Sequence, residues 1–146
     1  MAVEFYELDQ KVHQRLAVRS QTPEQHQQWY GKASQIAEYV SSWGMVRFWA
    51  LSRSQVARGG RNAENQDGEG GENYFAWKVA REILCDLVGN DLNIQENLIT
   101  DVFHQRFYNL SFNQQVLLTD LLLEIAETIQ FWSVRLKEAL DEQRPL

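Results

Sequence analysis

The stretch that decides the fold runs from Ser111 to Glu142 and reads SFNQQVLLTDLLLEIAETIQFWSVRLKEALDE. Ser111 and Gln114 form a capping-box pattern, which marks the start of a helix. Downstream of it, apolar residues recur at spacings of three and four, which is the period of one helical face. They are Leu118, Leu122, Ile125, Ile129, Trp132, Leu136 and Leu140, and the stripe is widened by Leu117, Leu121 and Leu123. The stretch therefore predicts one long helix that contacts several neighbouring helices.

The same period upstream predicts two helices that pack on the long one. The first spans about residues 4–19, with an apolar face of Phe5, Leu8, Val12 and Leu16. Thr22-Pro23-Glu24-Gln25 repeats the capping box and opens a second helix, with proline at its first position. We expect that helix to end at Gly44 in a left-handed C-cap. Its apolar face is formed by Trp29, Ala33, Ile36, Val40 and Trp43.

The middle of the chain predicts shorter elements and a loop. Residues 45–51 are apolar nearly all round, which is typical of a short helix enclosed by others. Residues 58–73 hold five of the eight glycines and no large apolar side chain, so we expect a flexible loop rich in glycine and acids. A helix from about Tyr74 to Val88 is expected to stop at Gly89-Asn90, and another lies near residues 94–107.

These segments predict an all-α fold, a single helical bundle of about five to six helices with a long C-terminal helix. The chain has 146 residues, 44% of them hydrophobic, so we expect residues 1–146 to form one domain. The lone Cys85 has no partner for an internal disulfide and lies on an apolar helix flank. An acidic N-terminus and the lack of a long apolar run predict a cytoplasmic protein without membrane contact.

Residues that carry chemistry are scattered. His13, His26 and His104 lie on separate predicted helices, without a second ligand at metal-binding spacing. The acids Asp120, Glu124 and Glu127 share one helical face, but the Glu-x-x-His motifs of a di-metal bundle are missing, so we interpret them as a solvated stripe. The glycine-acid run at 68–72 lacks the lysine of a phosphate loop. We therefore predict no enzymatic activity, no metal and no cofactor.

One cluster of arginine and aromatic residues is not expected from the acidic overall composition. The net charge is −6, which restricts any nucleic-acid contact to a local surface. Between Glu38 and Glu64 there is no acidic residue, but the interval holds Arg47, Arg53, Arg58 and Arg61, with Trp43, Phe48 and Trp49 among them. An arginine guanidinium can donate two hydrogen bonds to phosphate oxygens, and aromatic rings can stack on bases. This zone is therefore a candidate phosphate-binding surface. The alternative is that the aromatic residues are core and the arginines extend from a buried helix toward acids of the following loop.

Two sets of residues carry a resemblance to a known family. The first is Trp29, Ala33, Ile36, Val40, Gly44, Met45, Trp49, Ala50, Leu51, Arg53 and Ser54. The second is the segment from Trp132 to Leu140, preceded by Leu118-Thr119. Together they resemble the small helical subunit of type III-B CRISPR effector complexes, the Cmr small subunit. Ala37 stands where that family usually has proline and residues 58–73 resemble an insertion, so a divergent small subunit of a related type III complex is the alternative.

The resemblance implies a non-catalytic protein that stacks in several copies along the backbone subunits of an RNA-guided complex, which also has a large subunit. Such a subunit lines the path of guide RNA and target RNA, and Arg47, Arg53, Arg58 and Arg61 are then the candidate RNA-binding residues. Two other functions stay open. The wide apolar seam favours a helical adaptor or regulator that binds only protein. A helical-bundle enzyme with a bound cofactor has the least support.

Overall fold

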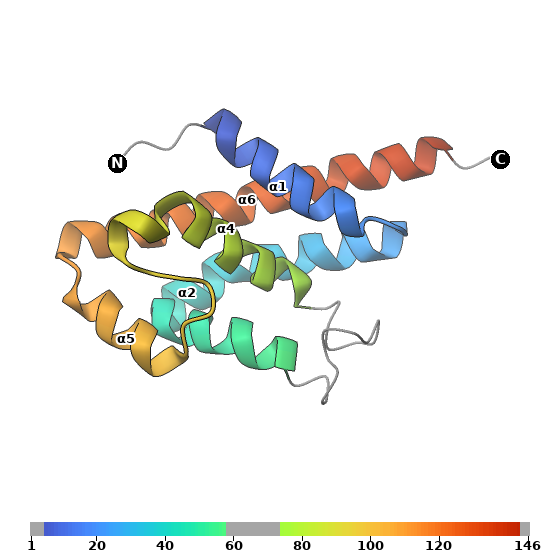
Figure 1. Cartoon of the computed structure of the whole chain (residues 1–146). Coiled ribbons are helices and arrows are strands. Elements are labelled where there is room, and N and C mark those ends of the chain that lie inside the picture. The colour runs from blue at the N-terminus through green and yellow to red at the C-terminus, as the bar shows by residue number, and fades with distance from the viewer. Residues whose placement is uncertain (1–4, 58–73, 144–146) are drawn as a thin grey trace.

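The computed structural model describes residues 5–57 and 74–143, and every regular element in these ranges is an α-helix. The all-α prediction is therefore confirmed. The predicted loop at 58–73 lies outside the described residues. In chain order the helices are α1 (Phe5–Arg19), α2 (Pro23–Ala57), α4 (Phe75–Leu92), α5 (Thr100–Asn109) and α6 (Phe112–Gln143) (Figure 1).

Helix α6 runs along the length of the bundle and packs against α1, α2 and α4 (Figure 1). Its capping box forms as predicted, because the Ser111 backbone N–H donates to Gln114 Oε1 at 3.0 Å and the Gln114 N–H donates to Ser111 Oγ at 3.1 Å. The predicted stripe is buried from Leu118 to Ile129 and half-buried from Trp132 to Leu140. Leu117 is exposed, so the stripe is narrower at that point than the sequence predicts.

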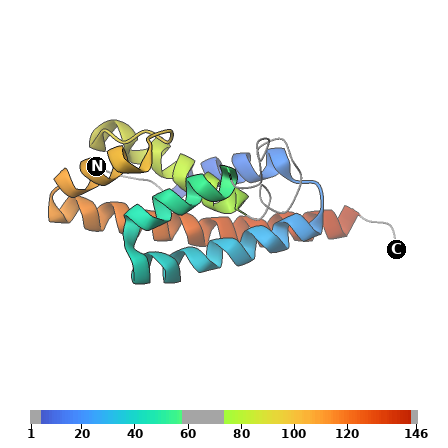
Figure 2. The same cartoon turned by 90° about the horizontal axis from the view of Figure 1, so that it is seen from below.

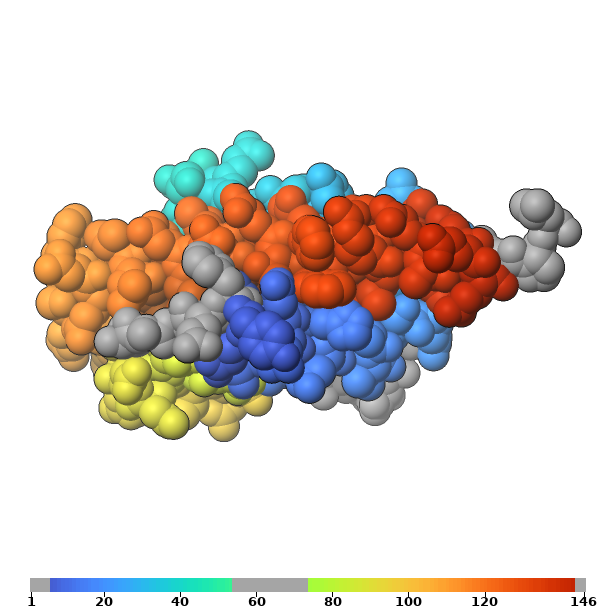
Figure 3. Space-filling model, turned by 90° about the horizontal axis from the view of Figure 1, so that it is seen from above, coloured from blue at the N-terminus to red at the C-terminus, as the bar shows by residue number. Residues whose placement is uncertain are grey.

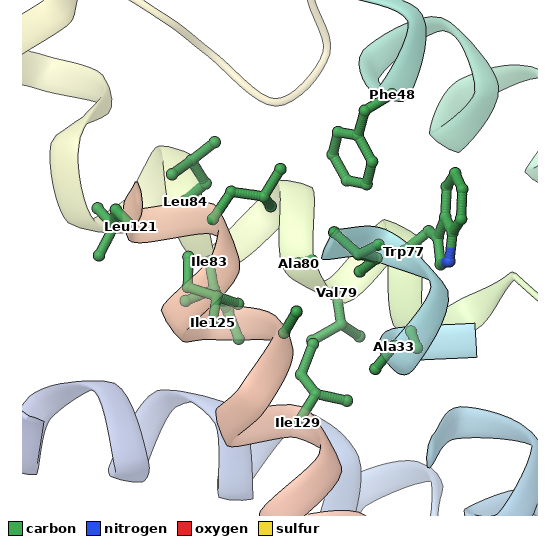
Figure 4. Close-up of a cluster of buried hydrophobic side chains, with 14 of the residues drawn as sticks. Ala33, Phe48, Trp77, Val79, Ala80, Ile83, Leu84, Leu121, Ile125 and Ile129 are labelled. Carbon is green, nitrogen blue, oxygen red and sulfur yellow. The ribbon is translucent and has the colours of Figure 1, made fainter. Parts of the chain in front are cut away.

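The core lies where α6 meets α4 and the two halves of α2. Figure 4 shows Ile125 and Ile129 of α6 facing Val79 and Ile83 of α4, with Trp77 further along the same helix. Burying an aliphatic side chain of this size stabilises the fold by about 1.5–3 kcal/mol relative to leaving it in water. The outer face of α6 stays open between α1 and α2, as the view from above shows (Figure 3).

Helix α2 consists of two helical segments that meet at Gly44, the residue at which the sequence predicts a helix end. It begins as predicted, because the Thr22 N–H donates to Gln25 Oε1 at 2.9 Å and the Gln25 N–H donates to Thr22 Oγ1 at 3.3 Å. At Gly44 the backbone adopts φ 87° and ψ 172°, and the chain turns back sharply before the helix resumes (Figure 2). We call residues 23–43 the first arm and residues 45–57 the second arm.

The predicted helix end at Gly44 is confirmed, but two of its details differ from the prediction. The expected left-handed C-cap at Gly44 is wrong, because a ψ of 172° is extended and lies far from the left-handed helical region near 47°. This conformation is essentially restricted to glycine. The short helix expected over 45–51 instead continues to Ala57 as the second arm. Gly44 therefore acts as a hinge point between two helical arms.

The boundaries of α4 and α5 also differ from the prediction. Helix α4 passes through Gly89 and ends at Leu92, and its C-cap residue Asn93 adopts the left-handed conformation with φ 58° and ψ 47°. A Cβ at Gly89 would lie 2.4 Å from the Ile94 carbonyl oxygen, so glycine is needed here for close packing. Residues 94–99 are not helical, and α5 begins at Thr100. Ile94 is nevertheless buried, so it was counted as the first core position of the helix predicted near residues 94–107.

Helix α1 is fastened at both of its sides. Arg15 forms ion pairs with Glu82 at 3.1 Å and with Asp86, both on α4. Trp132 of α6 donates its indole N–H to Asp9 Oδ1 at 3.1 Å. Within residues 5–57 and 74–143, no helix combines the length and the apolar character needed to cross a membrane.

Candidate nucleic-acid interface

The second arm of α2 is positioned by two tryptophans. Trp77, in the first turn of α4, contacts Phe48 of the second arm with ring centroids 5.3 Å apart and Tyr39 of the first arm at 5.4 Å. Its indole N–H donates to the Lys32 carbonyl oxygen at 2.8 Å. On the opposite side, Trp49 donates to the Leu98 carbonyl oxygen at 2.9 Å. The angle between the two arms is therefore held from both sides.

Arg47 and Trp43 form an exposed pair at the kink. The Arg47 guanidinium lies 4.4 Å from the centroid of the Trp43 ring, and the Trp43 side chain is 55% exposed. The prediction that Trp43 belongs to the core is wrong, because the turn at Gly44 carries this end of the first arm away from the bundle. Phe48 and Trp49 are fully buried, as the core interpretation of these aromatic residues predicts.

Arg53 lies apart from Arg47, near a buried arginine that the sequence did not single out. Arg81 of α4 is only 8% exposed, and its Nη1 donates to Ser52 Oγ at 3.0 Å. Burial lowers the pKa of Arg81, and the positive charge of Arg53 lowers it further. The Arg81 Nε has no hydrogen-bond partner among the described residues. Arg53 itself is half-buried.

Of the four arginines predicted as one site, Arg47 and Arg53 are among the described residues, and these two lie in different environments. Arg47 is exposed at the kink, and Arg53 lies beside Arg81. Arg58 and Arg61 lie outside the described residues. The second arm is helical to Ala57, which is further along the chain than the predicted end at Leu51. Arg47 is therefore the one predicted RNA-binding residue seen on an open surface in residues 5–57 and 74–143.

A cavity of about 290 Å³ opens between the two arms of α2 and the start of α4. Aromatic rings form much of its wall, and all of them lie near the kink or near Trp77. They belong to Tyr39, Trp43, Tyr74 and Trp77. The Lys32 Nζ lies 4.6 Å from the centroid of the Tyr74 ring, so a second cation stands beside this cavity. Tyr39 lies one helical turn before Trp43 on the first arm, so sequence spacing already places these two side chains near each other, whereas Tyr74 reaches the cavity only through folding.

A second hollow lies where α5 meets α6. This groove of about 390 Å³ is lined by Phe107, Phe112, Gln115, Val116, Thr119 and Asp120, and we call it the α5–α6 groove. Phe112 is 77% exposed, which is unusual for a phenylalanine in a folded domain. Val116 and the neighbouring Tyr108 are also exposed. The groove therefore has an apolar part, formed by Phe107, Phe112 and Val116, beside a polar part formed by Gln115, Thr119 and Asp120.

The other candidate residues occupy separate places. His13 packs against Trp132, His26 contacts Ser20 and Trp29, and His104 packs against Tyr108. In the part of the chain that the structure describes, no three His, Cys, Asp or Glu side chains are grouped closely enough to hold a metal ion. Burial raises the pKa of the Cys85 thiol to about 12. At neutral pH this thiol is protonated and a poor nucleophile.

No family model, curated protein or solved structure matches this chain.

Proposed function

We propose that this chain is a non-catalytic small subunit of a type III CRISPR ribonucleoprotein, which stacks in several copies along the backbone subunits and lines the guide and target RNA path. The observation that carries the RNA contact is the exposed Arg47–Trp43 pair, with 4.4 Å between the guanidinium and the ring centroid. An arginine held over an aromatic ring presents its donors to phosphate while the ring offers a stacking surface. The CRISPR assignment rests on the resemblance of Trp29 to Ser54 and of Trp132 to Leu140.

Several structural features support this proposal. Among the family-like positions Trp29, Ala33, Ile36 and Trp49 are fully buried, as expected of residues that define a shared core. The stretch after Glu38 is free of acids up to Glu64, so the kink is locally positive on a chain of net charge −6. The α5–α6 groove provides an apolar surface for a neighbouring copy or a backbone subunit.

The direct test is purification of the tagged full chain from its native cells. The proposal predicts that it copurifies with a discrete small RNA and with larger subunits, and that ribonuclease treatment leaves a protected fragment. Arg47→Glu is expected to lower the yield of that RNA. Its matched control is Arg135→Glu, because Arg135 is also exposed and also lies over an aromatic ring, 4.6 Å from the Phe131 centroid.

The outcomes separate RNA binding from general disruption. Loss of RNA in Arg47→Glu but not in Arg135→Glu supports the proposal. Equal RNA yields from both variants and from the wild-type chain would show that Arg47 does not contribute to RNA binding. A chain that recovers neither RNA nor larger subunits contradicts the whole proposal.

The second candidate function is a helical adaptor that binds only protein, and the α5–α6 groove is the observation that favours it. Phe112→Asp places a charge in the apolar wall of this groove on a side chain that is already 77% exposed, so the fold is expected to tolerate it. An adaptor loses its protein partner in this variant and shows no RNA in any preparation. Retention of a protected RNA by the wild-type chain excludes this candidate.

A further inference from the structure

Four aromatic side chains line the cavity between the arms of α2, and of these Trp77 is buried while Trp43 is exposed. Trp77 is fixed by its hydrogen bond to the Lys32 carbonyl oxygen, and Tyr39 and Tyr74 contact it with ring centroids 5.4 Å and 5.6 Å away. Trp43 adds an exposed ring at the mouth of the cavity. The Trp77 ring is covered by its neighbours, so the rings that a planar ligand can meet are the exposed Trp43 and the half-buried Tyr39 and Tyr74.

Polar groups lie along one wall of the same cavity. The first arm carries three of them at spacings of three and four, which places them on one face of the helix. They are Gln35, Glu38 and Ser42. The glutamine amide and the serine hydroxyl each donate and accept hydrogen bonds, and the carboxylate accepts them. This combination suits the edge of a nucleobase, which carries both donors and acceptors.

The charges around the cavity favour a ligand whose enclosed part is uncharged and whose part at the rim is negative. The guanidinium of Arg47 lies over Trp43 and the ammonium of Lys32 lies over Tyr74, so both cations stand at rings of the wall. The one ionisable acid of the lining is Glu38, which disfavours an anion deep in the cavity. A nucleotide meets both conditions, because its base is uncharged and its phosphates remain near the rim.

We infer that this cavity receives one unstacked base of single-stranded RNA, with the adjoining phosphates held by Arg47 and Lys32. The inference rests on the proposed RNA contact and deepens it by naming what the site holds. The volume of about 290 Å³ lies at the lower end for small-ligand sites, which fits one base better than a stacked pair. Single-stranded RNA is commonly recognised through bases that leave the stack and lie on aromatic side chains.

The test blocks the cavity without changing its charge. Ser42→Trp places an indole in the cavity from an exposed position on the first arm, and Ser41→Trp places the same side chain next to it on a residue outside the lining. Both proteins are titrated with a short single-stranded RNA and with a sugar-phosphate chain of equal length that lacks bases. Thermal melts verify that each variant is folded.

The inference predicts that Ser42→Trp weakens binding of the intact RNA about tenfold, which corresponds to about 1.4 kcal/mol. Binding of the base-free chain is expected to stay unchanged in that variant, and Ser41→Trp is expected to match the wild type with both ligands. Trp43→Ala removes an exposed ring and is a second variant, which is expected to weaken the intact RNA and not the base-free chain.

Three results overturn the inference and differ in what they say of the proposed function. If Ser42→Trp binds intact RNA like the wild type while Arg47→Glu binds it weakly, RNA contacts the kink but no base enters the cavity. If no protein binds RNA even at low salt, the proposed function fails together with the inference. If tetramethylammonium saturably quenches tryptophan fluorescence and RNA does not, the aromatic wall is a cation site.

Discussion

The two sides of the second arm of α2 have similar composition and opposite environments. On the kink side, Arg47 is exposed over Trp43, next to a cavity. On the α4 side, Arg53 is half-buried and lies near the buried Arg81, which donates to Ser52. A short stretch of chain thus places one arginine where it is free to meet an external phosphate and another beside a desolvated cation. Burial, and not the local charge in the sequence, therefore decides whether Arg47 or Arg53 is available to a ligand.

The largest expected effect on the free energy of unfolding comes from replacing a buried tryptophan, Trp49, and the matched control replaces the exposed Trp43 at the kink. Trp49 is fully buried, stacks on Phe103 with ring centroids 4.1 Å apart, and donates to the Leu98 carbonyl oxygen. Trp49→Ala is expected to lower the free energy of unfolding by about 3–5 kcal/mol. The matched Trp43→Ala is expected to change it by less than about 1 kcal/mol, because the Trp43 ring is largely in water. Urea denaturation of both variants checks this, and equal losses would contradict the assigned environments.

A smaller effect is expected at the hinge that separates the two sides. Gly44 has φ 87° and ψ 172°, and no atom lies within 4 Å of a Cβ built there. Gly44→Ala therefore adds backbone strain without a clash and is expected to destabilise the fold by about 1–3 kcal/mol. Gly31 is helical and its Cβ position is also open, so Gly31→Ala is expected to stabilise the fold by about 0.5–1 kcal/mol. Thermal melts that show the same sign for both substitutions would contradict the kinked backbone.

The next test uses pH and the thiol on the α4 side. Burial raises the pKa of Cys85 from 9.0 in water to about 12 in the fold. Because the folded state holds the proton more tightly, this contribution to stability is complete below pH 9 and is lost as the pH rises from 9 toward 12. Cys85→Ala is expected to lose less stability than the wild type between pH 8.5 and pH 10.5, as measured by urea denaturation at both values. Parallel curves for the two proteins would show that the thiol is not buried in this way.

The smallest effect on stability is expected at Arg47. Its contact with the exposed Trp43 ring contributes about 0.5–1 kcal/mol at most, so Arg47→Met is expected to lower the free energy of unfolding by no more than that. The same substitution is expected to reduce the slope of log binding constant against log salt by about 0.7 on single-stranded RNA, because one phosphate contact is lost. A large loss of stability with an unchanged salt slope would assign Arg47 a structural role.

The sequence was sufficient for the elements that obey a simple period. The capping boxes at Thr22 and Ser111 form as predicted, and the buried stripe of α6 from Leu118 to Ile129 follows from its spacing alone. These features are local, since a cap or a helical face depends on residues within a turn or two. The first helix was also predicted to end where α1 ends, at Arg19.

The remaining features depend on contacts between distant residues. The helix end at Gly44 was predicted, but the direction in which the second arm leaves it was not, because Trp77, more than thirty residues away, packs against both arms. Gly89 looked like a helix end, but its missing side chain makes room for the Ile94 carbonyl oxygen. The candidate site was only partly foreseen for the same reason. Arg47 and Trp43 were named from sequence, and the place of Tyr39 follows from its four-residue spacing to Trp43, whereas Tyr74 and Arg81 join the site or its surroundings through folding.

The central claim is that RNA contacts the cavity at the kink, which Tyr39, Trp43 and Tyr74 line, and not the surface around Arg53 and Arg81. Ultraviolet crosslinking of the assembly purified from native cells, followed by mass spectrometry of the crosslinked peptides, measures this contact directly. The account predicts a nucleotide attached to Trp43, Tyr39 or Tyr74, and loss of this crosslink in Ser42→Trp. Crosslinks confined to other surfaces, such as the exposed Phe131 of α6, would contradict it.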